Sequence, residues 1–172
     1  MKTLMDSQSV REAIKRIARA IKSNFGDKPD IILIGIVTRG VCIAERIKKE
    51  LEKYCKIPEV GSLDITFYRD DVGSIAKQPL AKETRLPVDI NGRTVILVDD
   101  VLFTGRSIRA ALDELMDFGR PASVQLAVLV DRGHRELPIQ ADYTGEKITT
   151  RRSDEVKVSL AEIDGRDEVS LV

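Results

Sequence analysis

Three largely apolar runs constrain the fold of this chain more than any other feature. They are DIILIGI at 30–36, VILV at 95–98 and SVQLAVLV at 123–130. Strands that are apolar on both faces are typical of a parallel sheet covered by helices on both sides. Apolar residues recur at helical spacing over 10–21, 44–54 and 108–115, so helix and strand alternate. The alternation predicts an α/β fold with a mostly parallel sheet.

Other segments refine this outline. Ser9 and Glu12 have the spacing of a capping box, which predicts a helix start. The SLDITFY segment at 62–68 alternates apolar and polar residues, as a strand does. The polar stretch 69–86 is too long for an ordinary connection unless it is functional or disordered. After Asp131 the strand-like patterns become short, so 131–172 is expected to form an appendage to a single domain spanning 1–172.

Composition narrows the possible partners and location. Basic and acidic residues number 28 each, so a nucleic-acid or membrane surface would have to be local. The N-terminus becomes charged before a signal peptide could form, and no apolar run approaches the roughly 18 residues of a membrane span. Cys42 and Cys55 are expected about 20 Å apart on one helix, too far for a disulfide. With a single histidine, a zinc site lacks ligands. We expect a cytoplasmic protein with no membrane partner.

The segment RTVILVDDVLFTGRS carries the most specific chemistry. Asp99 and Asp100 end a buried strand, where adjacent like charges are costly unless a ligand interacts with them. Thr104, Gly105 and Ser107 follow at a predicted helix start, whose N–H groups and dipole favour a phosphate. The carboxylates suit a ligand's hydroxyl groups or a metal that it carries, so a ribose 5-phosphate would fit. The alternative is an Asp-rich turn in which Thr104 caps the helix.

Two other segments are expected at the same edge of the sheet, because ligands of open α/β sheets bind at the carboxyl ends of the strands. They are Thr38-Arg39-Gly40 and Asp131-Arg132-Gly133. The chain contains no G-x-x-x-x-G-K-[ST] motif, and no G-x-G-x-x-G follows a strand, so the common nucleotide-binding loops are excluded.

The VILVDDVLFTGRS segment at 95–107 is similar to the phosphoribosyl-pyrophosphate (PRPP) signature of type I phosphoribosyltransferases. TRG at 38–40, DITFYRDD at 64–71 and DRGHRELP at 131–138 extend the resemblance. Nearly end to end, the chain resembles the bifunctional members that are both uracil phosphoribosyltransferases and attenuators of pyrimidine operons. The resemblance implies the type I phosphoribosyltransferase fold, with helices flanking a mostly parallel sheet, a small C-terminal hood and a long flexible loop at about 69–86.

The resemblance also implies roles for individual residues in PRPP binding. Asp99, Asp100 and Arg39 are the catalytic candidates: the two acids would bind the ribose hydroxyls, and Arg39 the pyrophosphate. The full expected set is Thr38, Arg39, Gly40, Arg85, Asp99, Asp100, Val101, Leu102, Phe103, Thr104, Gly105, Arg106 and Ser107. Arg69 and Arg85 lie in the loop expected to close over PRPP and exclude water. Mg²⁺ would arrive on PRPP rather than in a cage made only of protein ligands.

The uracil base would be recognised by the appendage. Arg132 and its neighbouring backbone are the first candidates, with Tyr143 available to stack and Val156 as a wall or backbone contact. In the structural alternative, Arg132 and Arg135 pair with Asp131 and Glu136, and Tyr143 fills the core. His134, the only histidine, has no accompanying nucleophile motif and is interpreted as a structural or interface residue.

RNA binding by the resembled proteins requires a local basic surface on this neutral chain. Two clusters are candidates: Arg11, Lys15, Arg16 and Arg19 on the first helix, and Lys147, Arg151 and Arg152. Gln140 and Glu146 stand where a basic residue would have helped. Ordinary solvated helix faces have such basic stripes too. The expected partners are PRPP, uracil, UMP or UTP, an mRNA leader and further copies of the chain in a homodimer or larger homo-oligomer.

Two alternative functions remain open. One is a catalytically weak PRPP- or nucleotide-sensing RNA regulator. The other is a type I phosphoribosyltransferase that acts on another base.

Overall fold

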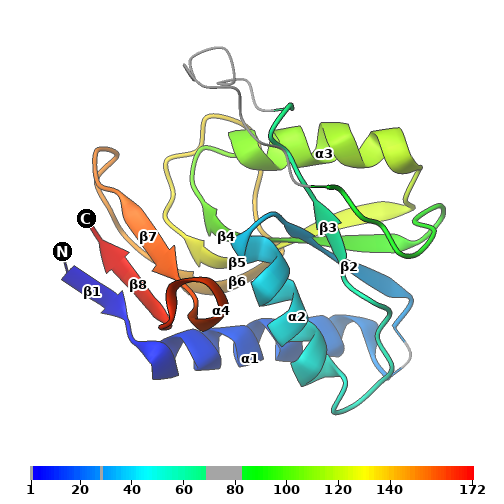
Figure 1. The fold of residues 1–172 in the computed structure, drawn as a ribbon, viewed down its shortest axis with the longest axis horizontal. Helices are drawn as coiled ribbons and strands as arrows, with labels where there is room; N and C mark the ends of the chain where they lie inside the picture. Colours follow the sequence, from blue (N-terminus) through cyan, green and yellow to red (C-terminus); the bar gives the residue numbers. More distant parts are fainter. Residues whose placement is uncertain (1, 28, 69–82) are drawn as a thin grey trace.

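A five-stranded parallel sheet forms the centre of the computed structural model, which describes residues 2–27, 29–68 and 83–172 (Figure 1). The strand order is β3-β2-β4-β5-β6. The bounds are Ile31–Ile36 for β2, Gly61–Leu63 for β3, Thr94–Leu102 for β4, Ser123–Asp131 for β5 and Tyr143–Lys147 for β6. Each neighbouring pair is parallel. The predicted α/β fold is therefore confirmed.

Three long helices cover the two faces of this sheet. Helices α1 (Ser7–Phe25) and α2 (Arg39–Leu51) lie on one face, and α3 (Arg106–Phe118) lies on the other (Figure 1). Alternate residues of each strand enter different cores: Ile96 and Val98 pack with α1 and α2, whereas Val95 and Leu97 pack with α3. This alternation explains why the central strands are apolar on both faces.

Helix α1 begins earlier than the capping-box pattern predicted. Asp6 is its N-cap, and the Asp6 carboxylate accepts a hydrogen bond of 2.8 Å from the Ser9 backbone N–H. Ser9 therefore lies within the first turn instead of capping it. An Asp cap satisfies one of the N–H groups that a helix start leaves without a partner.

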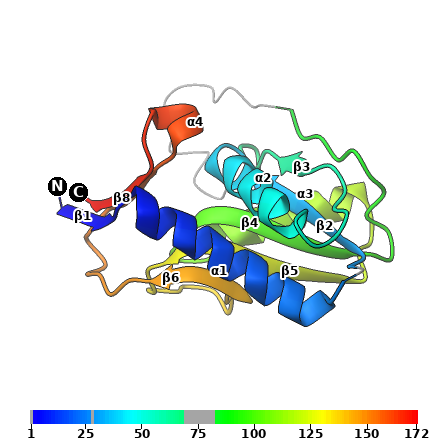
Figure 2. The ribbon, with the colours of Figure 1, turned by 90° about the horizontal axis from the view of Figure 1, so that it is seen from below.

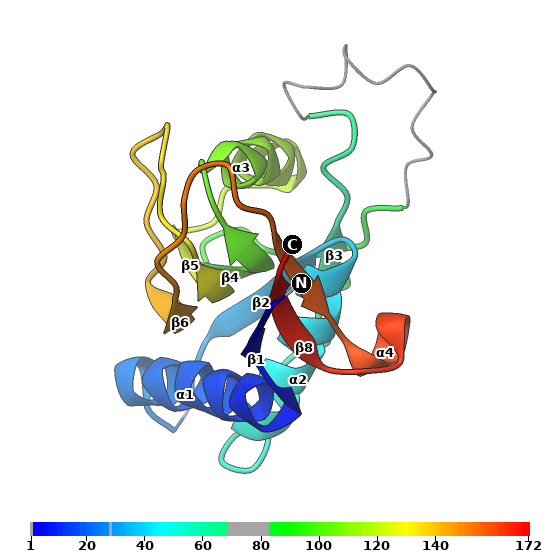
Figure 3. The same ribbon diagram turned by 90° about the vertical axis from the view of Figure 1, so that its left-hand side faces the viewer.

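A second, smaller sheet forms a hood over the carboxyl ends of the central strands (Figure 3). Its order is β1-β8-β7, with β1 at Lys2–Met5, β7 at Val156–Ser159 and β8 at Glu168–Leu171, and the short helix α4 at Ala161–Asp164 joins β7 to β8. Both pairs are antiparallel, and the two chain ends lie side by side (Figure 2).

The predicted appendage of 131–172 therefore divides between the two sheets. Residues 143–147 form β6 of the central sheet, and the hood also includes the N-terminal strand β1, which the sequence pattern did not predict. Strand β3 is also shorter than the predicted 62–68. After Leu63 the Asp64 carboxylate accepts a 2.9 Å hydrogen bond from the Thr66 N–H, and this local turn replaces the strand ladder.

Candidate active site

A cavity of about 350 Å³ opens at the carboxyl ends of β2 and β4. Several residues predicted to bind PRPP line it, namely Thr38, Arg39, Asp99, Asp100, Val101 and Ser107. The cavity is also lined by Asp64, Ile65 and Thr66, which follow β3. These three were not among the predicted site residues. Their position after a strand of the same sheet was the available signal, but the predicted strand ran through them to residue 68.

Asp99 and Asp100 lie within the last part of β4. Asp99 is 9% exposed and pairs with Val128 in the sheet. The Asp100 N–H donates to the Asp99 carboxylate at 2.9 Å, and the Val101 N–H donates to the Asp100 carboxylate at 2.8 Å. Burial raises the pKa of Asp100, although the Val101 N–H and the Arg39 guanidinium favour its ionised form.

The loop between β4 and α3 has the geometry of an anion-binding helix start. Gly105 has a φ of 93°, in the left-handed region that favours glycine, and α3 begins at Arg106. The Thr104 hydroxyl accepts a 3.3 Å hydrogen bond from the Arg106 N–H. Strand β4 continues to Leu102, whose side chain is in the core, so the loop proper starts at Phe103. The Leu102 carbonyl accepts a hydrogen bond from the Arg132 N–H.

The Thr38-Arg39-Gly40 segment forms the start of α2 and the opposite wall of the cavity. A Cβ atom on Gly40 would lie 2.3 Å from the Val98 carbonyl oxygen, so only glycine allows this approach to β4. Arg39 donates through Nη2 to both carboxylate oxygens of Asp164, at 3.0 and 3.2 Å. Its Nε is buried with no acceptor among the described residues.

Arg85 does not reach this cavity. Its guanidinium forms a 2.7 Å ion pair with Glu59, and its backbone forms a bridge to Ser62. Its predicted contact with PRPP is therefore not supported. Most of the predicted flexible loop, 69–82 including Arg69, lies outside the described residues.

Arg132 joins the end of β5 to the loop after β4. Its side chain is buried, its Cζ lies 4.1 Å from the centroid of the Phe103 ring, and its Nη2 donates to the Arg151 carbonyl at 2.9 Å. Arg132 forms no ion pair within the described part of the chain. The Arg135–Asp131 pair of the structural alternative is present, whereas Glu136 pairs with Arg106 and Arg152. Arg132 also lines a second, polar cavity of about 520 Å³ bounded by 131–135 and 147–150.

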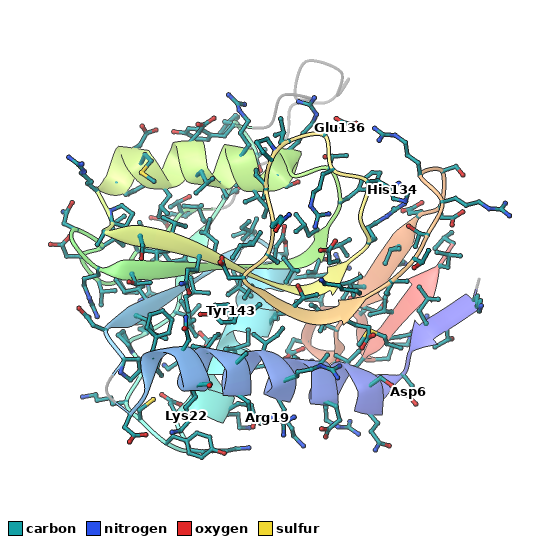
Figure 4. All side chains as sticks on the ribbon, turned by 180° about the vertical axis from the view of Figure 1, so that it is seen from behind. Asp6, Arg19, Lys22, His134, Glu136 and Tyr143 are labelled. Atoms are coloured by element: carbon teal, nitrogen blue, oxygen red, sulfur yellow. The ribbon has the colours of Figure 1, made fainter. Side chains whose placement is uncertain are left out.

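His134 is held within this second region. It has a φ of 63°, and its Nε2 lies 2.8 Å from the Thr150 carbonyl oxygen. Its ring meets Phe103 edge to face, at 6.0 Å between centroids. Figure 4 shows His134 on the loop that follows β5, beside the segment that leads to β7. These contacts agree with a structural histidine.

Tyr143 does not face either cavity, and its predicted stacking on uracil is wrong. It is 6% exposed and packs between β6 and α1, where its hydroxyl donates to Gln125 at 2.6 Å and accepts from Asn24 at 2.9 Å (Figure 4). The alternation of side chains along β6 directs Thr144, not Tyr143, toward the second cavity. Val156 packs against the core at the start of β7 and does not line either cavity.

The structure brings only one residue of each predicted basic cluster to a common groove, whereas Arg11 and Lys15 line a separate cavity. Arg16 from α1 and Lys147 from the end of β6 line a groove of about 510 Å³. Arg11, Arg19, Arg151 and Arg152 are exposed, and Lys15 is half-buried. Three of the bases have acidic partners: Lys15 with Glu12, Arg16 with Glu146 and Arg152 with Glu136. Figure 4 shows Arg19 and Lys22 pointing away from the sheet.

Within the described residues, no group of three or more His, Cys, Asp or Glu side chains is arranged to hold a metal ion. No helix in 2–27, 29–68 or 83–172 is long and apolar enough to cross a membrane.

Comparisons with known proteins agree with this geometry. The phosphoribosyl transferase domain model matches residues 1–164. A bifunctional protein PyrR from Chloroflexus aurantiacus is 51% identical, covering 99% of this chain and 94% of the relative. Another from Deinococcus deserti is 53% identical, covering 98% and 93%, and one from Clostridioides difficile is 51% identical, covering 98% and 96%.

Solved structures share the fold at low identity. A hypoxanthine phosphoribosyltransferase from Staphylococcus aureus has a TM-score of 0.71 at 18% identity, covering 98% of this chain and 90% of that one. A hypoxanthine-guanine phosphoribosyltransferase from Bacillus anthracis has a TM-score of 0.69 at 21% identity, covering 100% and 98%.

Proposed function

The chain belongs to the phosphoribosyltransferase family and, within it, to the PyrR proteins, and from this membership we propose that it converts uracil and PRPP to UMP and pyrophosphate. The observation that carries the proposal is the cavity where the start of α2, the end of β4 and the start of α3 meet. It places a cation, two carboxylates and a helix N-terminus around one space. Those groups match the pyrophosphate, the ribose hydroxyls and the 5-phosphate of PRPP.

The start of α3 binds the 5-phosphate. Gly105 lets the backbone turn sharply, so that the N–H groups of the first helical turn and the hydroxyls of Thr104 and Ser107 face the anion. The positive end of the helix dipole adds to the attraction. Arg135 stabilises the loop between β4 and α3, because the Phe103 carbonyl accepts a 2.9 Å hydrogen bond from it.

Asp99 and Asp100 bind the ribose hydroxyls as acceptors. Because both lie on β4 at the cavity, they also place negative charge beside the sugar, which gains oxocarbenium character as pyrophosphate leaves. Arg39 holds the leaving pyrophosphate at the opposite wall. The chain's contribution is thus to position the reactants and stabilise the separating charges.

Mg²⁺ fits this donor set, since carboxylate oxygens are the ligands that it prefers and it is commonly bound through one or two carboxylates together with substrate phosphates. When bound with PRPP, Mg²⁺ would neutralise charge on the pyrophosphate. Asp99 and Asp100 are the residues next to which it would lie.

Arg132 is the proposed base-recognition residue. It lies at the end of β5, stacks on the ring that follows β4 and is braced by the backbone of 151–152. It therefore ties the base-binding segment to the phosphate loop.

The test is UMP formation from uracil, PRPP and Mg²⁺, with hypoxanthine, adenine and orotate in parallel. Uracil-specific turnover that is lost in Asp99→Asn supports the proposal. Turnover of another base would replace uracil as the substrate. Binding of PRPP or UMP without turnover of any base would favour a nucleotide-sensing regulator. As a control, Asp30→Asn removes a carboxylate that pairs with Arg93 at the amino ends of β2 and β4, away from the cavity.

A second function, UMP-dependent binding of a pyrimidine-operon mRNA leader, is favoured by the groove that brings Arg16 and Lys147 together. The groove is also lined by Asp6, Glu12 and Glu146, so the exposed Arg19 on α1 is the cation proposed to add to its attraction for phosphates. Leader RNA should bind more tightly with UMP than without it at one stated salt concentration, and Arg19→Gln should weaken that binding. If neither the addition of UMP nor Arg19→Gln changes RNA binding, the proposed RNA function is contradicted. A homodimer or larger homo-oligomer, testable by light scattering, completes the proposal.

A further inference from the structure

Arg39 is held by a residue from the other end of the chain. Asp164, the last residue of α4, accepts from Arg39 Nη2 with both of its carboxylate oxygens. The Arg39 side chain is 31% exposed and that of Asp164 is 23% exposed, so this ion pair is partly shielded from water. Partial shielding makes the contact stronger than an ordinary surface pair.

A hydrogen bond within its own segment also holds the Asp164 carboxylate in place. Its Oδ2 accepts a 2.9 Å hydrogen bond from the Leu160 N–H. That hydrogen bond and the Arg39 guanidinium lower the pKa of the Asp164 carboxyl, which keeps it ionised at neutral pH. The carboxylate therefore stands at a defined place beside the start of α2.

A second arginine of α2 clamps the segment that carries Asp164. Arg46 binds Glu162 with bonds of 2.8 and 2.5 Å and Asp167 with bonds of 2.9 and 2.7 Å. Asp167 also accepts from the Ala161 N–H at 2.8 Å. Glu162 and Asp167 flank Asp164 in sequence, so the clamp holds α4 against α2 and keeps Asp164 within reach of Arg39.

Arg46 and Arg39 differ in how many of their side-chain nitrogens donate hydrogen bonds to these carboxylates. Arg46 donates through all three of its side-chain nitrogens, whereas Asp164 takes only Nη2 of Arg39. The Arg39 Nε has no acceptor among the described residues although it is buried. A guanidinium offers five N–H donors and the Arg39 side chain is 31% exposed, so donors other than the buried Nε remain for a ligand while Asp164 sets the orientation.

We propose that Asp164 is a positioning residue for pyrophosphate binding: it holds the Arg39 guanidinium at the cavity so that the exposed donors of Arg39 meet the pyrophosphate group of PRPP. The inference rests on the proposed role of Arg39. An arginine that is already held loses less rotamer freedom when the ligand binds. The hood thereby contributes to PRPP binding without touching PRPP.

The test compares Asp164→Asn with the wild-type chain, and with Asp30→Asn, which removes a more exposed ion-paired carboxylate far from the cavity. We expect Asp164→Asn to weaken magnesium pyrophosphate binding about tenfold by calorimetry and to raise the KM for PRPP by a similar factor. The kcat and the KM for uracil should change less than about threefold, and Asp164→Glu should recover part of the affinity. Asp30→Asn should match the wild-type chain.

A double-mutant cycle separates positioning from a general effect on folding. In an Arg39→Gln background, Asp164→Asn should cause no further loss of pyrophosphate affinity, since Asp164 acts through Arg39. An additive loss, unchanged affinity or tighter binding in Asp164→Asn would overturn the inference, and tighter binding would make Asp164 a competitor of the ligand. A wild-type chain that does not bind pyrophosphate would overturn it too. Pyrophosphate binding without uracil turnover would contradict only the proposed function.

Discussion

The guanidinium of Arg132 lies over the ring of Phe103, with 4.1 Å between Cζ and the ring centroid. Arg132 follows β5 and Phe103 follows β4, so this contact links the segment proposed to recognise the base to the loop proposed to bind the 5-phosphate. The Arg132 Nη2 also donates to the carbonyls of Arg151 and Arg152, at 2.9 and 3.5 Å. A planar guanidinium can stack and donate at the same time, which an ammonium cannot do.

We therefore expect Arg132→Lys to lower kcat/KM for uracil at least about tenfold, because hydrogen bonds to charged groups contribute about 1.5–3 kcal/mol. Phe103→Leu keeps the charge and the carbonyl contacts and should cause a smaller loss. Steady-state kinetics with uracil varied at saturating PRPP would measure both. Equal activity of Arg132→Lys and the wild-type chain would remove Arg132 from base recognition.

We expect Asp100→Asn to be more stable and less active than the wild-type chain. Burial raises the pKa of Asp100, so its ionised form destabilises the folded state. The folded chain then binds more protons than the unfolded chain between the ordinary value of 3.8 and the raised pKa, and stability falls as pH rises through that window. The variant lacks this cost and should have the higher Tm at neutral pH.

The advantage of Asp100→Asn should shrink as pH falls toward 3.8. Its turnover should fall at least about tenfold, since the amide lacks the negative charge and has one acceptor oxygen instead of two for the proposed contact with the ribose hydroxyls. Thermal unfolding at several pH values and PRPP kinetics would check both effects. A lower Tm at neutral pH would contradict the cost assigned to burial.

Tyr143→Phe should affect stability and not base recognition. Removing the hydroxyl breaks its hydrogen bonds to the half-buried Gln125 and the exposed Asn24, at a cost of about 0.5–1.5 kcal/mol. Each ~1 kcal/mol corresponds to about 2–4 °C in Tm for a chain of this size. The KM for uracil should stay within about twofold. Tyr54→Phe, at an exposed side chain, is the control with little effect on Tm. A raised KM would restore Tyr143 to the base site.

Glu136→Gln should strengthen RNA binding. Glu136 pairs with Arg106 and Arg152, and these partners lower the pKa of its carboxyl, so it offsets their charge at neutral pH. Without it, Arg152 is available to phosphates. The slope of log affinity against log salt should steepen by about 1. Glu52→Gln removes the same charge from an exposed pair on α2 and is the control. Equal slopes for both variants would exclude Arg152 from the RNA surface.

The fold class and the centre of the site could be predicted because their determinants are local. A run such as VILV is apolar on both faces wherever it occurs, and it requires helices on both sides of the sheet. The carboxylates of Asp99 and Asp100 and the turn at Gly105 lie within seven residues, so the strand, loop and helix that hold them are specified by one continuous segment.

Other features depend on which distant segments pair, and short sequence patterns do not contain that information. Strand β6 joins the central sheet through its parallel register with β5, and this register sends Tyr143 into the core beneath α1. Strand β1 pairs with β8 from the opposite end of the chain. The turn at Asp64 brings three further residues to the cavity.

Local sequence is therefore enough to specify a helix-covered parallel sheet and an acidic strand end followed by a glycine turn and a helix start, because backbone propensity and apolar periodicity act over a few residues. The contacts of Asp164 with Arg39 and of Glu136 with Arg152 depend instead on tertiary packing. Ion pairs between residues far apart in the chain form only after packing has brought their elements together.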